Sequence, residues 1–146
     1  MYAVDVSREA LEVAQMNRIK HDVETQLHLL QSDCFDALPH AAYDLIISNP
    51  PYVGGDEMAH LPKEYQHEPE LALYAENNGL DVEEKMLFSA SKYLSEHGIL
   101  VMEVGNSEEA LVAAYPQVPF TWLEFERGGT GIFLLTAAQL NTHFNA

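Results

Sequence analysis

The 146-residue sequence predicts an α/β fold: a doubly wound, mostly parallel sheet with an antiparallel hairpin at its C-terminal end. Two observations carry this prediction. Short strand-like runs alternate with segments of helical periodicity, which is the pattern of βαβ units. The segment at residues 98–104 contains a continuous apolar run, as in a parallel strand that helices cover on both faces. Because no repeat or linker interrupts the chain, residues 1–146 are expected to form one domain.

The first half of the chain predicts three strands, at residues 2–6, 27–31 and 43–48, and one helix. Ser7 can cap the helix that follows the first strand, because its hydroxyl can accept a bond from a backbone N–H of the first turn. Residues that can pack inward recur at helical spacing along this helix. The predicted buried face consists of Ala10, Val13, Ala14 and Asn17.

The second half begins with a polar segment, residues 53–79, that glycines and prolines interrupt. A connection of this length is usually a lid or a binding segment. The next helix has Glu83 and Glu84 in its first turn, where solvated acidic residues are common because they interact favourably with the helix dipole. The predicted elements are a helix at 80–97 that ends at Gly98, a strand at 98–104, a helix near 107–115, and strands at 120–126 and 132–136.

Acidic residues dominate the charge of the sequence. Asp and Glu number 23 against 7 Lys and Arg, which gives a formal net charge of −16. Phosphate binding relies on clusters of Lys and Arg, so the sequence argues against duplex nucleic acid and anionic membrane as partners. A basic protein fits this charge, because opposite net charges speed encounter. The alternative is that the acidity only keeps the domain soluble.

Cysteine usage and hydropathy indicate a cytoplasmic protein. Cys34 is the only cysteine, so no internal disulfide can form, and we expect it to be a small buried hydrophobe rather than a nucleophile. No apolar run approaches the roughly 18 residues of a transmembrane helix, and the N-terminus lacks the pattern of a secretory signal. The seven histidines show no metal-ligand spacing with the cysteine, so no metal site is predicted.

Several polar residues follow directly after the predicted strands, namely Asp5, Asp33, Asn49 and residues 103–106. The carboxyl ends of parallel strands meet at one edge, and ligands of open α/β sheets bind there, so these residues are expected to share a site. Asp5 is placed to accept hydrogen bonds from the two ribose hydroxyls of a nucleoside cofactor. The alternative for Asp5 is an ordinary solvated acid beside a helix N-terminus.

The most specific motif is Asn-Pro-Pro-Tyr at residues 49–52, directly after the third predicted strand. Its two prolines fix the backbone and hold the carbonyl groups in place. The Asn49 side-chain oxygen and the Pro50 carbonyl then form a pair of acceptors that suits the two N–H bonds of an NH₂ group. Tyr52 adds a flat face on which a planar amide or base can stack. The alternative interpretation is an ordinary Pro-Pro turn after a strand.

Residues 48–53 resemble the Asn/Asp-Pro-Pro-Tyr motif of S-adenosylmethionine (SAM) dependent methyltransferases, which modify either glutamine amides in proteins or adenine in nucleic acids. Residues 61–73 and 125–133 are similar to the protein glutamine methyltransferase family. Within that family, the similarity is greatest to the bacterial branch that acts on the third large-subunit ribosomal protein. The resemblance implies a Rossmann-like fold, SAM as cofactor, and methyl transfer to the side-chain amide of a glutamine in a basic ribosomal protein.

The same resemblance implies roles for residues at the predicted edge. It implies that Asn49 and Pro50 are catalytic, that substrate binding involves Asn49, Pro50, Pro51 and Tyr52, and that the cofactor contacts Asp5, Val6, Asp33, Cys34 and Asn49. Cys34 stands where related glutamine methyltransferases carry an aromatic residue.

Methyltransferases of this class normally begin with a strand and a glycine-rich loop under the cofactor, and no such segment occurs in residues 1–5. Residues 1–146 are therefore expected to be a partial catalytic domain, without the first strand, the glycine-rich loop and the N-terminal helical domain. Such a chain is expected to be inactive by itself and to bind SAM weakly or not at all.

Two other functions stay open from the sequence. An adenine methyltransferase on DNA or RNA uses the same motif on a flipped base, although the charge of −16 argues against a nucleic-acid substrate. A non-catalytic acidic module would only dock a basic protein.

Overall fold

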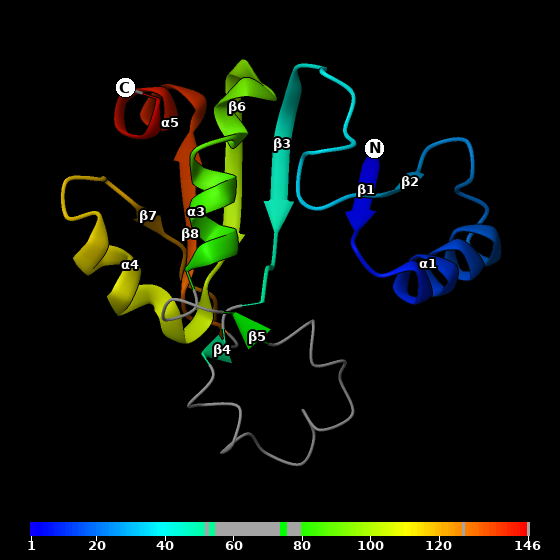
Figure 1. The fold of residues 1–146 in the computed structure, drawn as a ribbon, viewed down its shortest axis with the longest axis horizontal. Helices are drawn as coiled ribbons and strands as arrows, with labels where there is room; N and C mark the ends of the chain where they lie inside the picture. The colour runs from blue at the N-terminus through cyan, green and yellow to red at the C-terminus, as the bar shows by residue number, and fades with distance from the viewer. Residues whose placement is uncertain (52, 55–73, 76–79, 127, 146) are drawn as a thin grey trace. The chain divides into compact units, whose positions relative to one another are not determined.

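The structure, a computed structural model, describes residues 1–51, 53–54, 74–75, 80–126 and 128–145. The chain divides into two units, Met1–His40 and Ala41–Ala146, and each is described by itself. In Figure 1 the first unit runs from blue to cyan and the second from cyan to red. None of the helices in this described part combines the length and hydropathy that crossing a membrane requires.

The first unit is a βαβ arrangement, as predicted. Strands β1 (Tyr2–Asp5) and β2 (His28–Gln31) are parallel, and helix α1 (Arg8–Lys20) connects them. The register runs from Tyr2 opposite His28 to Asp5 opposite Gln31. Because the strands are parallel, their carboxyl ends lie at the same edge of this small sheet.

Helix α1 begins as the sequence predicted but presents a different face. The Ser7 hydroxyl accepts a hydrogen bond from the Ala10 N–H at 3.2 Å, which confirms Ser7 as the cap. The predicted buried face is wrong, because Val13 is 52 % exposed and no residue of α1 is fully buried. The half-buried Arg18 lies on the inward side instead, and its Nη1 donates to the Leu27 carbonyl at 2.8 Å. The half-buried positions are Leu11, Ala14, Gln15 and Arg18.

The second unit contains a four-stranded sheet with the order β3-β6-β8-β7. Strands β3 and β6 are parallel, whereas β8 is antiparallel to both β6 and β7, which confirms the predicted antiparallel C-terminal strands. The bounds are Tyr43–Ser48 for β3, Leu94–Glu103 for β6, Thr121–Trp122 for β7 and Ile132–Thr136 for β8. A separate parallel pair consists of β4 (Val53–Gly54) and β5 (Tyr74–Ala75).

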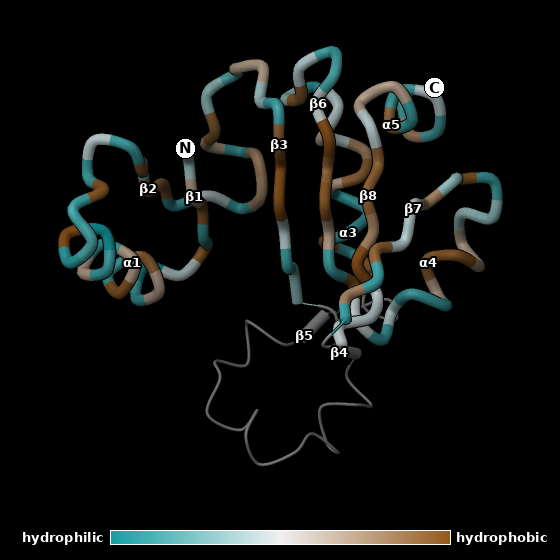
Figure 2. The backbone as a smooth tube through the Cα atoms, turned by 180° about the vertical axis from the view of Figure 1, so that it is seen from behind, coloured by the Kyte–Doolittle hydropathy of each residue, from teal (hydrophilic) through white to brown (hydrophobic). Residues whose placement is uncertain are grey.

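Helices α3 (Asp81–Leu87), α4 (Glu108–Ala114) and α5 (Ala137–Phe144) form one layer in this unit. Their ends meet through aromatic rings: Phe144 lies 5.3 Å from Phe88 and 5.2 Å from Tyr115, measured between ring centroids. Figure 1 shows α3 in front of β6 and β8, and Figure 2 shows it behind them from the opposite side. Two 3₁₀ turns, η4 (Ala90–Lys92) and η5 (Gly105–Ser107), complete the unit.

The two faces of the four-stranded sheet differ in exposure. One face consists of Leu100, Met102, Phe133 and Leu135, which are all 0 % exposed. On the opposite face, Leu45 is 50 % and Ile47 is 71 % exposed. The brown segments of β3, β6 and β8 in Figure 2 are the hydrophobic centres of these strands. The core of the second unit therefore lies on the face that carries the first group of residues.

The predicted helix at 80–97 is wrong beyond Leu87. The η4 turn follows, and β6 already begins at Leu94. Gly98 does not stop a helix: it lies within β6, and a Cβ at this position would lie 2.7 Å from the Tyr43 carbonyl oxygen. The absence of a side chain lets β3 approach β6 closely at this irregular point of the register. The predicted strand at 120–126 is likewise shorter, since only Thr121–Trp122 pairs.

The sequence interpretation missed helix α5. Its N-terminus has a capping box, in which Thr136 Oγ1 accepts from the Gln139 N–H at 3.2 Å and Gln139 Oε1 accepts from the Thr136 N–H at 2.8 Å. The Thr-x-x-Gln spacing at residues 136–139 was the signal that could have found this helix.

Candidate functional site

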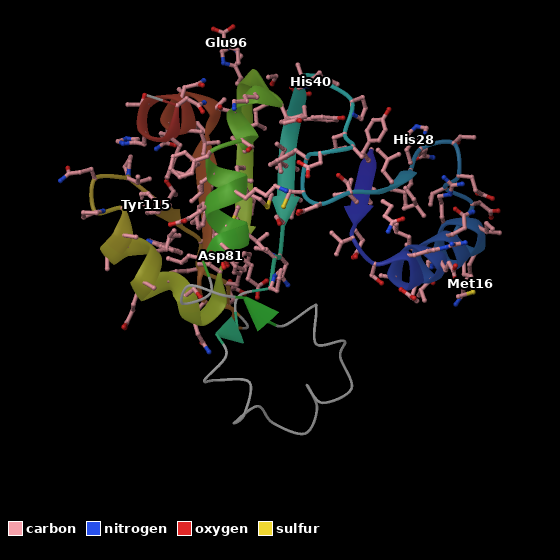
Figure 3. All side chains as sticks on the ribbon, in the orientation of Figure 1. Met16, His28, His40, Asp81, Glu96 and Tyr115 are labelled. Carbon is pink, nitrogen blue, oxygen red and sulfur yellow. The ribbon has the colours of Figure 1, made fainter. Side chains whose placement is uncertain are left out.

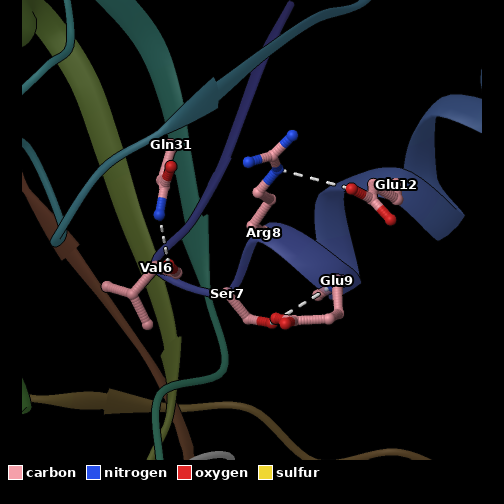
Figure 4. A network of polar contacts seen from close by, with 7 residues as sticks. Val6, Ser7, Arg8, Glu9, Glu12 and Gln31 are labelled. Carbon is pink, nitrogen blue, oxygen red and sulfur yellow. Dashed lines mark hydrogen bonds and ion pairs between the residues drawn. The ribbon is translucent and has the colours of Figure 1, made fainter.

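In the first unit, the predicted cofactor residues follow the carboxyl ends of β1 and β2. Asp5 is the last residue of β1, and its carbonyl accepts a hydrogen bond from the Ser32 N–H at 3.0 Å. The Gln31 side chain donates from Nε2 to the Val6 carbonyl at 2.9 Å, as Figure 4 shows. These bonds hold the segments that carry Asp5 and Val6 next to the segment that carries Asp33 and Cys34.

The Asp5 carboxylate is exposed and oriented by the backbone. Its Oδ1 accepts a hydrogen bond from the Ser7 N–H at 2.7 Å, at the start of α1. A carboxylate held in this way at a strand end can accept hydrogen bonds from a pair of vicinal hydroxyls. The chemistry of Asp5 therefore fits the ribose of a nucleoside cofactor.

A tight turn positions Asp33 and Cys34. The buried Ser32 hydroxyl donates to the Cys34 carbonyl at 3.0 Å and accepts from the Ala37 N–H at 2.9 Å. Cys34 adopts a left-handed backbone conformation, with φ of 50°, that few residues other than glycine favour. Its side chain is half-buried, so the expectation of a buried hydrophobe is wrong, because the turn brings this residue toward the surface. Asp33 is exposed on the same turn.

In the second unit, Asn49 and Pro50 continue the chain directly beyond β3. The last paired residues of β3 and β6 are Ser48 and Met102, so the register carried one residue further places Asn49 beside Glu103. Asn49 is exposed, whereas Pro50 is buried and Pro51 half-buried. The two prolines restrict the backbone directly after the exposed Asn49. This placement agrees with the predicted edge, and the catalytic roles of Asn49 and Pro50 stay predictions.

Glycines bring the ends of β6 and β8 into backbone contact near this edge. Gly131 has a φ of 69°, and a Cβ at this position would lie 2.4 Å from the Gly105 carbonyl oxygen. The Val104 N–H donates to the Gly131 carbonyl at 2.7 Å. The glycines at 128–131 are therefore part of the connection into β8, in agreement with the predicted turn between two strands.

Glu83 contradicts the prediction of a solvated acid. Its side chain is 0 % exposed, and neither carboxylate oxygen has a hydrogen-bond partner. Burial raises the pKa of Glu83 to about 7. The reason is its spacing: with Met86, Leu87 and Ala90 it forms the inward stripe of α3 and η4 at i, i+3, i+4 and i+7.

The neighbouring Glu84 has a defined partner. The Tyr115 hydroxyl donates to Glu84 Oε1 at 2.9 Å, joining α3 to the end of α4. Burial, followed by this bond to Glu84, raises the pKa of Tyr115 to about 12. Figure 3 labels Tyr115 at the end of α4 and Asp81 at the start of α3.

Some of the predicted features lie outside the described residues. Tyr52 and the segment at 61–73 are among them. Within the part that is described, no group of three or more His, Cys, Asp or Glu residues could hold a metal ion.

Comparison with known sequences identifies the relatives of this chain. The family model of the methyltransferase small domain matches residues 1–64. A ribosomal protein uL3 glutamine methyltransferase from Francisella tularensis is 46 % identical over 137 residues, which cover 94 % of this chain and 44 % of the relative. One from Neisseria gonorrhoeae is 48 % identical over 138 residues, covering 94 % and 46 %. The chain is homologous to the ribosomal protein uL3 glutamine methyltransferases. It spans less than half the length of these curated relatives.

Solved methyltransferase structures show that this homologue has their Rossmann-like fold. A methyltransferase from Pyrococcus furiosus aligns with a TM-score of 0.62 at 18 % identity, covering 92 % of this chain and 60 % of that one. The human Mettl16 catalytic domain, solved with an RNA hairpin, aligns with a TM-score of 0.64 at 19 % identity, covering 92 % and 54 %. A putative methyltransferase from Streptococcus mutans, solved with S-adenosylhomocysteine (SAH), aligns at 0.53 and 17 % identity, covering 92 % and 73 %.

Proposed function

We propose that this chain forms part of an enzyme that transfers a methyl group from SAM to the side-chain amide nitrogen of a glutamine in ribosomal protein uL3. The identity of 46–48 % to enzymes named for this reaction supports the proposal. The observation that carries it is the exposed Asn49 on a buried Pro50 at the carboxyl end of β3. The relatives extend well beyond the matched region, so activity is expected of the complete gene product.

The proposed chemistry starts from the weakness of an amide as a nucleophile. The nitrogen lone pair is delocalised into the carbonyl group. When Asn49 Oδ1 and the Pro50 carbonyl accept hydrogen bonds from the two N–H groups of the amide, electron density at the nitrogen rises and the orientation of the amide is fixed. The methyl carbon can then be attacked in line, and the main contribution is positioning to about 3–3.5 Å.

SAM, when bound, would supply a methyl group activated by its positive sulfonium. Asp5 is proposed to bind the ribose hydroxyls, and Asp33 and Cys34 to flank the adenine. Val6 is proposed to contact the cofactor beside Asp5. Asn49 is proposed to contact the cofactor as well as the substrate. The solved methyltransferase with SAH supports this cofactor class for the fold.

The substrate is proposed to be basic, because the chain carries a net charge of −16 and opposite charge favours encounter. A cytoplasmic location is also proposed. A ribosomal-protein substrate fits this location, and so does a sequence whose single cysteine, Cys34, can form no internal disulfide.

Offering SAM labelled in its methyl group to the full-length gene product tests the proposed reaction. Purified uL3, duplex DNA and ribosomal RNA serve as acceptors in separate reactions. We expect label in uL3 only. Label in DNA or RNA would favour the adenine methyltransferase, and binding of uL3 without label in any acceptor would favour a docking module.

A further inference from the structure

Glu103 is a carboxylate next to the proposed amide-binding residue. It is the last residue of β6, and the parallel register places it beside Asn49, one position beyond the Ser48–Met102 pair. On its other side it pairs with Ile132 of β8. Glu103 therefore lies at the carboxyl edge of the sheet, between the two neighbouring strands.

Alternation along the strands places Asn49 and Glu103 on the same face of the sheet. In β6, Leu100 and Met102 are fully buried, whereas Val101 and Glu103 are half-buried on the opposite face. Ile47 pairs with Val101 and is 71 % exposed, and the alternation of β3 carried one residue beyond its end assigns the exposed Asn49 to that same face. Neighbouring strands of a sheet lie about 4.7–4.9 Å apart, so residues at matching positions on one face are neighbours.

Methyl transfer to an amide creates a charge that Asn49 and Pro50 are poorly suited to remove. As the N–C bond forms and the C–S bond breaks, the electron pair of that bond goes to sulfur, and the nitrogen becomes positively charged while it still holds two protons. One proton must then leave. Amide and peptide carbonyl oxygens can accept a hydrogen bond, but they are weak bases, whereas a carboxylate both stabilises the cation and takes up the proton.

We propose that Glu103 is the group that stabilises the positive amide nitrogen and accepts its proton after methyl transfer. This inference rests on the proposed glutamine methyltransferase activity. Asn106, exposed just beyond the same edge, has no titratable group. The buried Glu83 lies on the inward stripe of α3, which packs on the face of the sheet away from Asn49. Among the described residues at the carboxyl end of the β3–β6 pair, Glu103 is the carboxylate that the register places beside Asn49.

The test compares Glu103→Gln with Glu96→Gln in the full-length gene product, with uL3 and SAM as substrates. Glu96 is an exposed glutamate near the opposite end of the same strand, so its substitution removes the same charge without touching the edge. We expect Glu103→Gln to lower kcat by about 100-fold or more, the usual contribution of a positioned proton acceptor. Glu96→Gln should change kcat by less than about twofold, and both variants should bind uL3 and SAM like the wild type in calorimetry.

A second variant keeps the test independent of small structural changes. Formate or acetate added to Glu103→Ala should restore at least about a tenth of the lost rate, because a free carboxylate can occupy the vacated position. Wild-type rates in Glu103→Gln, or no rescue of a folded Glu103→Ala variant, would overturn the role of Glu103 and leave the proposed function intact. If the wild type methylates no glutamine, the proposed function and this inference both fail.

Discussion

At the scale of single residues, Asn49 and Glu83 show what a motif and a periodic pattern can each predict. The Asn-Pro-Pro-Tyr motif directly after a predicted strand indicated the position of Asn49. The structure places Asn49 just beyond the end of β3, where it is exposed. Glu83 was misjudged because acids in a first helical turn are usually solvated. The inward spacing of Glu83 with Leu87 and Ala90 was present in the sequence and outweighs that tendency.

The buried Glu83 predicts a specific dependence of stability on pH. Its pKa is about 7 in the folded chain against an ordinary value of 4.5, so the folded state holds the proton where the unfolded state has released it. The stabilisation is fully present below pH 4.5 and is lost as the pH rises through 7. Between pH 5 and 8, Glu83 should lower the free energy of unfolding by about 2–3 kcal/mol.

Urea unfolding of the wild type, Glu83→Gln and Glu109→Gln at these two pH values measures this effect. Glu109 is exposed in α4, so its substitution removes an equal charge without relieving burial. The decrease in stability between the two pH values should be smaller in Glu83→Gln than in the other two proteins. An equal decrease in all three would show that Glu83 does not carry the effect.

At the scale of elements, strands were predicted better than helices. The bounds of β3 and β8 match the sequence prediction because each strand is a short apolar run that ends at a polar residue or a glycine connection. The predicted helix at 80–97 is wrong beyond Leu87 because residues 94–97 belong to β6, in which Leu94 pairs with Tyr43 and Ile99 with Leu45 of β3. The spacing of residues along the chain could not predict this strand, because it gives no information on the close approach of Tyr43 in β3 to Gly98.

The close backbone contact at Gly131 predicts a large effect of a single methyl group. Gly131 and Gly128 both have positive φ, at 69° and 89°, so alanine strains the backbone at either position. Of these two positions, a Cβ at Gly131 would lie 2.4 Å from the Gly105 carbonyl oxygen, whereas a Cβ at Gly128 would have no atom within 4 Å. Gly131→Ala should therefore be less stable than Gly128→Ala by about 1–3 kcal/mol. Equal unfolding midpoints of the two variants in urea would contradict this packing argument.

At the scale of the whole molecule, the residues predicted for the site belong to both units. The predicted cofactor residues Asp5 and Asp33 lie in the first unit, and Asn49 lies in the second. These residues could be predicted from the sequence, because each of them comes at or just after the end of a recognisable strand. The net charge of −16 belongs to the whole chain and predicts the class of partner rather than the fold.

The net charge of −16 predicts that binding to the proposed substrate, uL3, weakens as the salt concentration rises. Raising NaCl from about 50 mM to about 500 mM should slow association of the full-length gene product with uL3 by at least roughly tenfold, because screening removes long-range attraction. Stopped-flow fluorescence measures the association rate, and duplex DNA should not bind at either concentration. An association rate that salt leaves unchanged would rule out electrostatic attraction as the basis of encounter.

The rate and position of methyl transfer in Asn49→Ala test the central claim most directly. Tandem mass spectrometry of uL3 after reaction with the full-length wild type should locate one methyl group on the side-chain nitrogen of a glutamine. Loss of one of two acceptors should slow this transfer at least about tenfold in Asn49→Ala, given the 2–4 kcal/mol typical of such a contact, with a milder loss in Tyr52→Phe. Equal rates in Asn49→Ala and wild type, or a methyl group on an atom other than the amide nitrogen, would contradict the account.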